Sequence, residues 1–180
     1  MKQYKLLDVM PECYVDTNLI EYLLNAGVNH QHCCSKVVGQ LNTTFADRFA
    51  IGIIDKDKVQ LGYLSECNII VQSKHLTVYK HCQRCQYLIT INPAIEGFVL
   101  DCAKDLEVIP ESFGLSSQLK EFTKISKSVT SNTDARFKSL FASLSNHSEI
   151  MILKKLLVYL CENKYQSNID EVRCFFEESL

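Results

Sequence analysis

The feature that most constrains the fold is a continuous apolar run at residues 49–54, Phe-Ala-Ile-Gly-Ile-Ile, which ends abruptly in Asp55-Lys56-Asp57-Lys58. A strand without polar positions is typical of a sheet that is covered by helices on both faces. We therefore predict a central, fully buried strand at these residues, with acidic side chains directly after it.

Apolar runs and helical patterns alternate along the first hundred residues, and the pattern is helical from about residue 113 to the end. This order predicts an α/β fold. We expect a mostly parallel sheet with flanking helices over residues 1–110, and a helical C-terminal extension packed on it over residues 111–180. The other predicted strands are 12–15, 28–34, 68–71, 76–79 and 87–91, and helices are predicted to begin near residues 17, 35 and 93.

Composition and charge exclude several classes of protein. Of the 180 residues, 47% are hydrophobic and 22% are charged, which excludes wholesale disorder. The net charge of -2 is unlike that of a protein that coats nucleic acid or an anionic membrane. Residues 1–8 lack the apolar stretch of a secretory signal, and the apolar segment 150–161 is interrupted by two lysines and is too short to span a bilayer. We expect a cytoplasmic protein with no membrane association.

The chain has nine cysteines, an odd and high number. Without a secretory signal, this number favours reduced thiols that act as small hydrophobic side chains over a disulfide framework. Cys82 and Cys85 form one C-x-x-C pair, and His30–Cys34 adds further soft ligands. A zinc ribbon needs two such pairs, so a structural zinc site remains the less favoured interpretation.

Acidic residues follow three of the predicted strands. Asp16 follows the first, Asp55 and Asp57 follow the apolar one, and Glu96 follows the strand at 87–91. The carboxyl ends of parallel strands meet at one edge of a sheet, so we expect these side chains to converge. Such oxygen ligands suit Mg²⁺ or Mn²⁺. The alternative is that they are solvated turn residues, because Asp is common where strands end.

Basic residues suggest where a phosphate group would be held. Lys120, Lys124 and Lys127 recur at helical spacing, and a second basic cluster begins at Lys80. We expect Lys127, or else Lys80, to stabilise developing negative charge at the acidic site; the alternative is a solvated helix face. The chain has no glycine-rich phosphate loop, so ATP would have to be supplied by a partner.

These motifs resemble a known family, the TOPRIM domain of topoisomerases, primases and OLD-type and RloB-like nucleases of phage defence. The resemblance covers about residues 12–105. It rests on Asp16, on Asp55-Lys56-Asp57, and on an apolar strand that is followed by Asn92-Pro93 and Glu96. It implies a TOPRIM-like (Rossmann-like) sheet with Asp16, Asp55, Asp57 and Glu96 as ligands of Mg²⁺ or Mn²⁺.

The resemblance also implies an activity and partners. We expect a metal-dependent nuclease acting on DNA or RNA, in which Asp55, Asp57, Glu96 and Lys127 are catalytic. It would serve as an effector or subunit in antiviral defence, with a partner ATPase or another defence subunit. The sequence leaves the substrate and the oligomeric state open.

Two alternatives stay open. The family's first acid is a Glu followed by Gly, and Asp16-Thr17 stands in that place here. The chain is therefore also compatible with a catalytically inactive TOPRIM-like subunit that regulates a larger complex. Residues 14–20 resemble the start of PIN-domain ribonucleases. A PIN-like toxin would depend strongly on Asp16 and little on Asp55.

Overall fold

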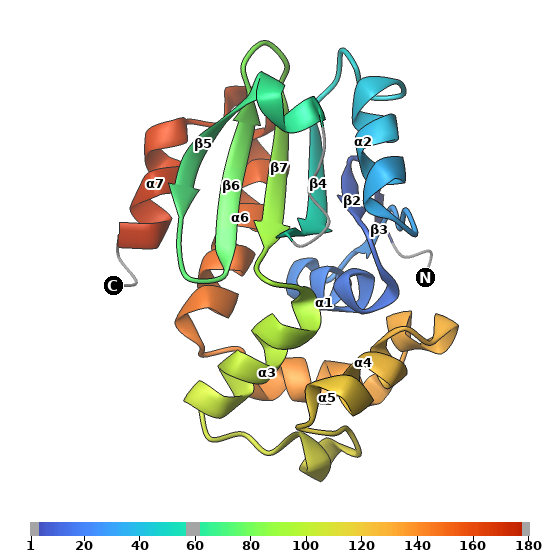
Figure 1. The fold of residues 1–180 in the computed structure, drawn as a ribbon. Coiled ribbons are helices and arrows are strands. Elements are labelled where there is room, and N and C mark those ends of the chain that lie inside the picture. The colour runs from blue at the N-terminus through green and yellow to red at the C-terminus, as the bar shows by residue number, and fades with distance from the viewer. Residues whose placement is uncertain (1–3, 57–61, 178–180) are drawn as a thin grey trace.

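A five-stranded mixed sheet forms the centre of the computed structural model, which describes residues 4–56 and 62–177 (Figure 1). Three strands are parallel, and the other two add antiparallel pairings at one edge. A small parallel sheet joins β1 (Lys5–Leu6) to β3 (Gly27–Val28). In spatial order the five strands are β2 (Val9–Pro11), β4 (Ala50–Asp55), β7 (Gln86–Ile91), β6 (Leu76–His81) and β5 (Cys67–Gln72).

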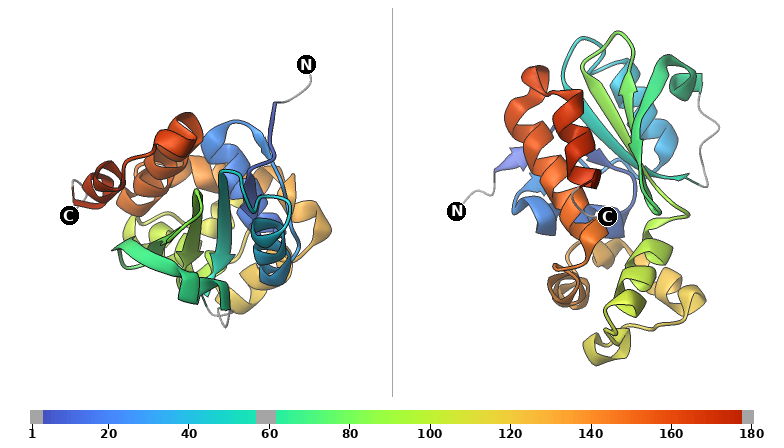
Figure 2. Two further views of the ribbon diagram at one scale, coloured as in Figure 1. Left: turned by 90° about the horizontal axis from the view of Figure 1, so that it is seen from above. Right: turned by 90° about the vertical axis from the view of Figure 1, so that its left-hand side faces the viewer.

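Helices cover both faces of this sheet. Figure 2 shows α2 on one side and the pair α6 and α7 on the other. Within the described residues, no helix is long and apolar enough to cross a membrane. The helices are α1 (Tyr14–Leu24), α2 (Cys34–Asn42), α3 (Ile95–Asp105), α4 (Leu119–Ser126), α5 (Ala135–Ser143), α6 (Ser148–Asn163) and α7 (Ile169–Glu177), with short 3₁₀ turns η2 (Gly62–Glu66), η3 (Pro110–Phe113), η4 (Val129–Asn132) and η5 (Lys164–Gln166).

The apolar run that dominates the sequence is the buried strand β4, as predicted. All six of its residues are buried. Its side chains alternate between two clusters, so that Ala50 and Ile54 pack in the cluster of α2, whereas Ile51 and Ile53 pack in the larger cluster on the opposite face. Each fully buried aliphatic side chain of this kind contributes about 1.5–3 kcal/mol to folding.

A glycine lets α2 approach β4 closely. A Cβ atom added at Gly52 would lie 2.8 Å from Val37 Cγ1 and 2.8 Å from Leu88 Cδ1. The C-terminal helices share the larger cluster with the sheet, since Phe137 and Leu153 are buried in it. The predicted α/β class and helical C-terminal region are therefore confirmed, although the sheet is parallel only across β2, β4 and β7.

The predicted strand at 12–15 is wrong, because the strand lies at 9–11 and α1 begins at Tyr14. Cys13 caps α1: its sulfur accepts from the Asp16 backbone N–H at 3.5 Å, and Asp16 Oδ2 accepts from the Cys13 N–H at 3.0 Å. This is a capping box in which Cys takes the place of the usual Ser or Thr. The predicted strand at 28–34 is likewise reduced to the two residues of β3.

Candidate functional site

A cleft of about 520 Å³ opens at the carboxyl end of the parallel strands. Its residues come from the ends of β2 and β4, the starts of α1 and α3, both ends of α4, and the connection between β3 and α2. Its lining comprises Glu12, Cys13, Tyr14, His30, His32, Asp55, Pro93, Ala94, Glu96, Gly97, Leu119, Thr123, Ser126 and Lys127.

Glu12 and Asp55 meet at the floor of this cleft. Glu12 directly follows β2, and Asp55 is the last residue of the neighbouring strand β4. The Glu12 N–H donates to the Ile53 carbonyl at 3.0 Å, and the Asp55 N–H donates to Glu12 Oε2 at 3.3 Å. Asp55 Oδ1 accepts from the N–H of Ile95 at 3.0 Å, at the start of α3, where the helix dipole favours negative charge. Both carboxylates are almost fully buried.

Asp16 is close enough to Glu12 and Asp55 for their charges to act on it, but it does not line the cleft. It sits in the first turn of α1, not after a strand as predicted, and its side chain is buried. Its Oδ1 atom has no hydrogen-bond partner in the part of the chain that the structure describes. Burial raises the pKa of Asp16 well above its usual value, and the negative charges of Asp55 and Glu12 raise it further. Three carboxyl groups are therefore crowded at this end of the sheet.

Glu96 and Lys127 line the same cleft, from the start of α3 and the end of α4. Glu96 is the second residue of α3, is buried, and accepts a hydrogen bond from the hydroxyl of Ser126 at the end of α4. Lys127 follows α4 and is exposed at the cleft. The structure thus brings together Asp55, Glu96 and Lys127 at one cleft. Asp57, the remaining predicted ligand, lies outside the described residues.

Lys80, the alternative charge-stabilising residue, is at the wrong end of the sheet. It pairs with Tyr87 near the start of β7, whereas the cleft lies beyond the other end of that strand. Its ammonium group donates to the carbonyl oxygens of His81 and Arg84. Lys80 therefore serves the turn between β6 and β7 and not the acidic cleft.

Sequence reasoning missed Glu12, Tyr14, His30 and His32 at this cleft. Glu12 was hidden by the misplaced strand: ending the strand at residue 11 makes Glu12 the first residue after it. The two histidines reach the cleft only because the β3–α2 connection folds beside α1, and no local sequence signal reports that contact.

The donor chemistry at the cleft fits a hard divalent cation. Glu12, Asp55 and Glu96 line the same cleft, and Asp16, which does not line it, has a buried oxygen without a partner among the described residues. Mg²⁺ binds through a few carboxylates and keeps several waters, so it does not require a closed protein cage. Within residues 4–56 and 62–177, no three His, Cys, Asp or Glu side chains are already gathered as ligands, either here or around Cys82 and Cys85.

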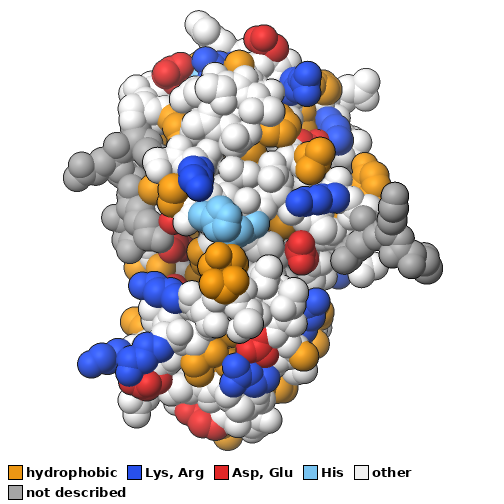
Figure 3. Space-filling view, turned by 90° about the vertical axis from the view of Figure 1, so that its right-hand side faces the viewer, with side chains coloured by type: hydrophobic (Ala, Val, Ile, Leu, Met, Phe, Trp, Pro, Cys, Tyr) orange, Lys and Arg blue, Asp and Glu red, His pale blue; other side chains and the backbone are white. Residues whose placement is uncertain are grey.

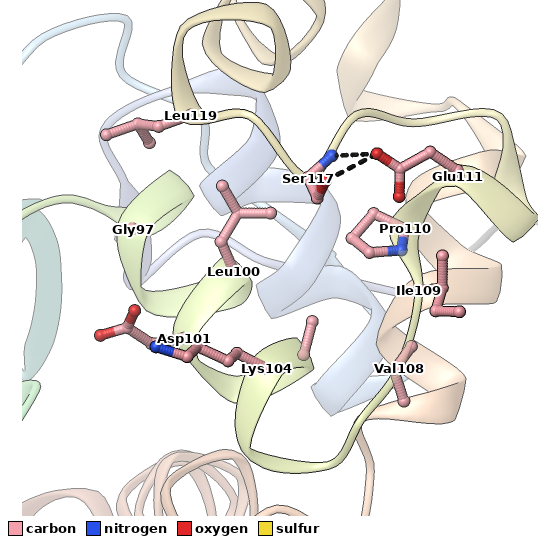
Figure 4. A pocket seen from close by; sticks show the side chains of 11 residues that line it. Gly97, Leu100, Asp101, Lys104, Val108, Ile109, Pro110, Glu111, Ser117 and Leu119 are labelled. Carbon is pink, nitrogen blue, oxygen red and sulfur yellow. Dashed lines mark hydrogen bonds between the residues drawn. The ribbon is translucent and has the colours of Figure 1, made fainter.

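A second cavity of about 490 Å³ adjoins the cleft and shares Gly97 and Leu119 with it. Figure 4 shows it between α3 and the segment that leads into α4, with Leu100 directed into it. Glu111 braces that segment, because its Oε1 accepts from the Ser117 N–H at 2.8 Å and from the Ser117 hydroxyl at 2.7 Å. The lining of this second cavity is mostly apolar.

No family model, curated protein or solved structure matches this chain. The function has to be argued from the cleft itself.

Proposed function

We propose that this chain is a Mg²⁺- or Mn²⁺-dependent nuclease of TOPRIM-like type, with the acidic cleft as its active site. One observation carries the proposal: Glu12, Asp55 and Glu96 line one cleft at the carboxyl edge of parallel strands, with Lys127 beside them. In open α/β sheets, this edge is where substrates bind.

Electrostatics favour a cation in this cleft. Among the described residues, Lys127 is the one lysine in the lining, so a phosphodiester that approached these carboxylates without a metal ion would meet net repulsion. Glu12, Asp55 and Glu96 would hold the cation, with Asp16 nearby and Asp57 as a further ligand proposed from the sequence. When bound, the cation would polarise the phosphoryl group and acidify water.

The chain's own residues would orient the substrate. Lys127 would pair with a non-bridging phosphate oxygen and neutralise charge that develops during hydrolysis. The buried Ser126 hydroxyl holds Glu96 in one orientation, and the start of α3 holds Asp55. A cleft of about 520 Å³ has the volume of a small-ligand site, so it accommodates the reacting nucleotide.

The test is cleavage of labelled single-stranded DNA, double-stranded DNA and RNA with Mg²⁺, with Mn²⁺ and with EDTA. We expect metal-dependent cleavage that Asp55→Asn and Glu12→Gln each reduce at least about 100-fold. Both replacements retain an oxygen that can accept the hydrogen bond from Ile95 or from Asp55. Asp47→Asn, at an exposed residue outside the cleft, is the matched control. Cleavage that persists in EDTA, or that both cleft variants leave unchanged, would overturn the proposal.

One observation favours the second candidate, a catalytically inactive subunit of a larger complex. Glu12, Asp55 and Glu96 each already accept a hydrogen bond from the protein, and the described residues contain no assembled group of three ligands. This candidate predicts no cleavage of any substrate and no metal binding. The proposed links to antiviral defence and to a partner ATPase rest on the sequence resemblance alone.

A further inference from the structure

Two histidines contact each other at the rim of the acidic cleft. His30 Nε2 and His32 Nδ1 are 2.9 Å apart, and both residues line the cleft from the connection between β3 and α2. Tyr14 stacks on His30 with ring centroids 4.5 Å apart and an interplanar angle of 22°. Figure 3 shows histidine side chains, in pale blue, grouped at the centre of one face of the molecule.

The hydrogen bonds behind this pair fix the direction in which protons are donated. The Thr17 hydroxyl is 2.8 Å from the carbonyl oxygen of Cys13, which can only accept, so the hydroxyl's single proton is donated there. The same hydroxyl is 2.8 Å from His30 Nδ1. His30 must therefore donate an N–H from Nδ1 to the Thr17 oxygen.

The remaining assignments follow from the neutral form of His30. Burial lowers the pKa of His30, and repulsion from His32 and Lys36 lowers it further, which favours the neutral ring. With its proton on Nδ1, neutral His30 accepts at Nε2, and His32 Nδ1 must donate to it. The Nε2 atom of a neutral His32 is then left as a lone pair.

The backbone of His32 adds a second, independent observation. Its φ angle is 73°, in the left-handed region that is uncommon for residues other than glycine, although Asn, Asp and His adopt it more often than most. Such a conformation persists only where the surroundings hold it, and it is found often at functional sites. Among the described residues, the ionisable groups that line the cleft or act on His30 are Lys36 on α2, Tyr14 on α1, and Glu12, Cys13, Asp55, Glu96 and Lys127 of the cleft.

We propose that His32 is the general base of the cleft and that His30 is a positioning residue which presents His32 Nε2 as a proton acceptor. This inference rests on the proposed nuclease function. His32 Nε2 takes one proton from a water molecule, and the water oxygen forms a bond to phosphorus. The bond from phosphorus to the leaving oxygen breaks, the leaving oxygen keeps the electron pair and takes a proton from solvent, and His32 returns its proton to solvent.

The first test reads the tautomers directly and needs no activity. Long-range ¹H–¹⁵N NMR of the metal-free protein at neutral pH should show both His30 and His32 with the proton on Nδ1. Thr17→Val removes the hydroxyl and should change the His30 pattern, while circular dichroism confirms that the variant is folded. If the neutral imidazole ring of His32 carries its proton on Nε2, the proposal is overturned.

The second test is kinetic. His32→Asn suits the positive φ angle, because Asn tolerates that region. We expect it to lower kcat about 100-fold or more with KM changed less than about threefold, and to alter the dependence of kcat on pH. Thr17→Val should lower kcat by a smaller factor than His32→Asn, because it would disturb the positioning of His32 through His30 and leave the base itself in place.

The outcomes separate the two proposals. Metal-dependent cleavage with an unchanged kcat and pH profile in His32→Asn overturns the role of His32 and leaves the proposed nuclease function intact. Absence of metal-dependent cleavage by the unaltered protein overturns the nuclease function and the proton-transfer role together.

Discussion

Replacing Asp16 with asparagine should stabilise the metal-free protein. Asp16 is buried, its Oδ1 has no hydrogen-bond partner among the described residues, and the negative charges of Asp55 and Glu12 act on it. An asparagine keeps an oxygen for the Cys13 N–H and places an amide N–H group near carboxylates. The substitution therefore removes a desolvated charge without removing the helix cap.

The size of this stabilisation follows from the cost of burying an unpaired polar group, and its pH dependence follows from proton linkage. A buried polar group without a partner costs about 1–3 kcal/mol. A gain of about 2 kcal/mol corresponds to a rise in Tm of about 4–8 °C for a chain of this size. The pKa of Asp16 is higher in the folded protein than in the unfolded chain, so the folded state binds the proton more tightly. The destabilisation of the fold by charged Asp16 therefore grows as pH rises above the pKa of the unfolded chain, about 3.9. The gain in Asp16→Asn should therefore grow as pH rises from about 4 to neutral, and it should disappear near pH 4.

The assay is thermal unfolding in EDTA at several pH values, followed by circular dichroism. Asp47→Asn makes the same change at an exposed position and should leave Tm within about 1 °C of the unaltered protein. A Tm for Asp16→Asn that is unchanged or lower at pH 7, or a gain that is the same at pH 4, would refute the reasoning.

Three further predictions concern the rest of the molecule. Gly52→Ala should lower the free energy of unfolding, measured with urea, by about 1–3 kcal/mol, because the new methyl group would overlap side chains 2.8 Å away. Gly39→Ala, which places its methyl group in open space on α2, should raise the free energy of unfolding by about 0.5–1 kcal/mol. His75→Phe should destabilise by about 3 kcal/mol in the same assay, since the ring nitrogens of His75 contact carboxylates of α3 and α6 at 3.0 and 3.1 Å. Iodoacetamide at pH 8 should label Cys33 before Cys102. A hydrogen bond with a serine lowers the pKa of the Cys33 thiol, whereas burial raises the pKa of the Cys102 thiol. Equal labelling rates, measured by mass spectrometry, would contradict this prediction.

Much of the sheet could be predicted from apolar runs, since β4, β6 and β7 are buried strands with clear polar boundaries. The antiparallel pairs could also have been foreseen. The connections 73–75 and 82–85 are too short for a parallel crossover, which needs a dozen or more residues. The connection from β4 to β7 contains β5 and β6, so the sequence alone did not show that β4 and β7 are neighbours.

The candidate site was only partly predictable, for reasons of local and long-range geometry. Asp55 and Glu96 were found because strand ends and helix starts leave a sequence signal. Asp16 was placed wrongly because a cysteine caps α1, and this error hid Glu12. His30 contacts both His32 and Thr17, which lies 15 residues before His32 in the sequence. Such a chain of contacts cannot be read from spacing.

The central claim is that the carboxylates of this cleft bind a divalent cation. Its most direct test is titration of Mn²⁺ into the metal-free protein, with free Mn²⁺ measured by electron paramagnetic resonance. We expect saturable Mn²⁺ binding for which Mg²⁺ competes. The double variant Glu12→Gln, Asp55→Asn should abolish this binding and keep the circular dichroism spectrum of the unaltered protein. A free Mn²⁺ signal equal to that of buffer, or binding that the double variant leaves unchanged, would contradict the central claim.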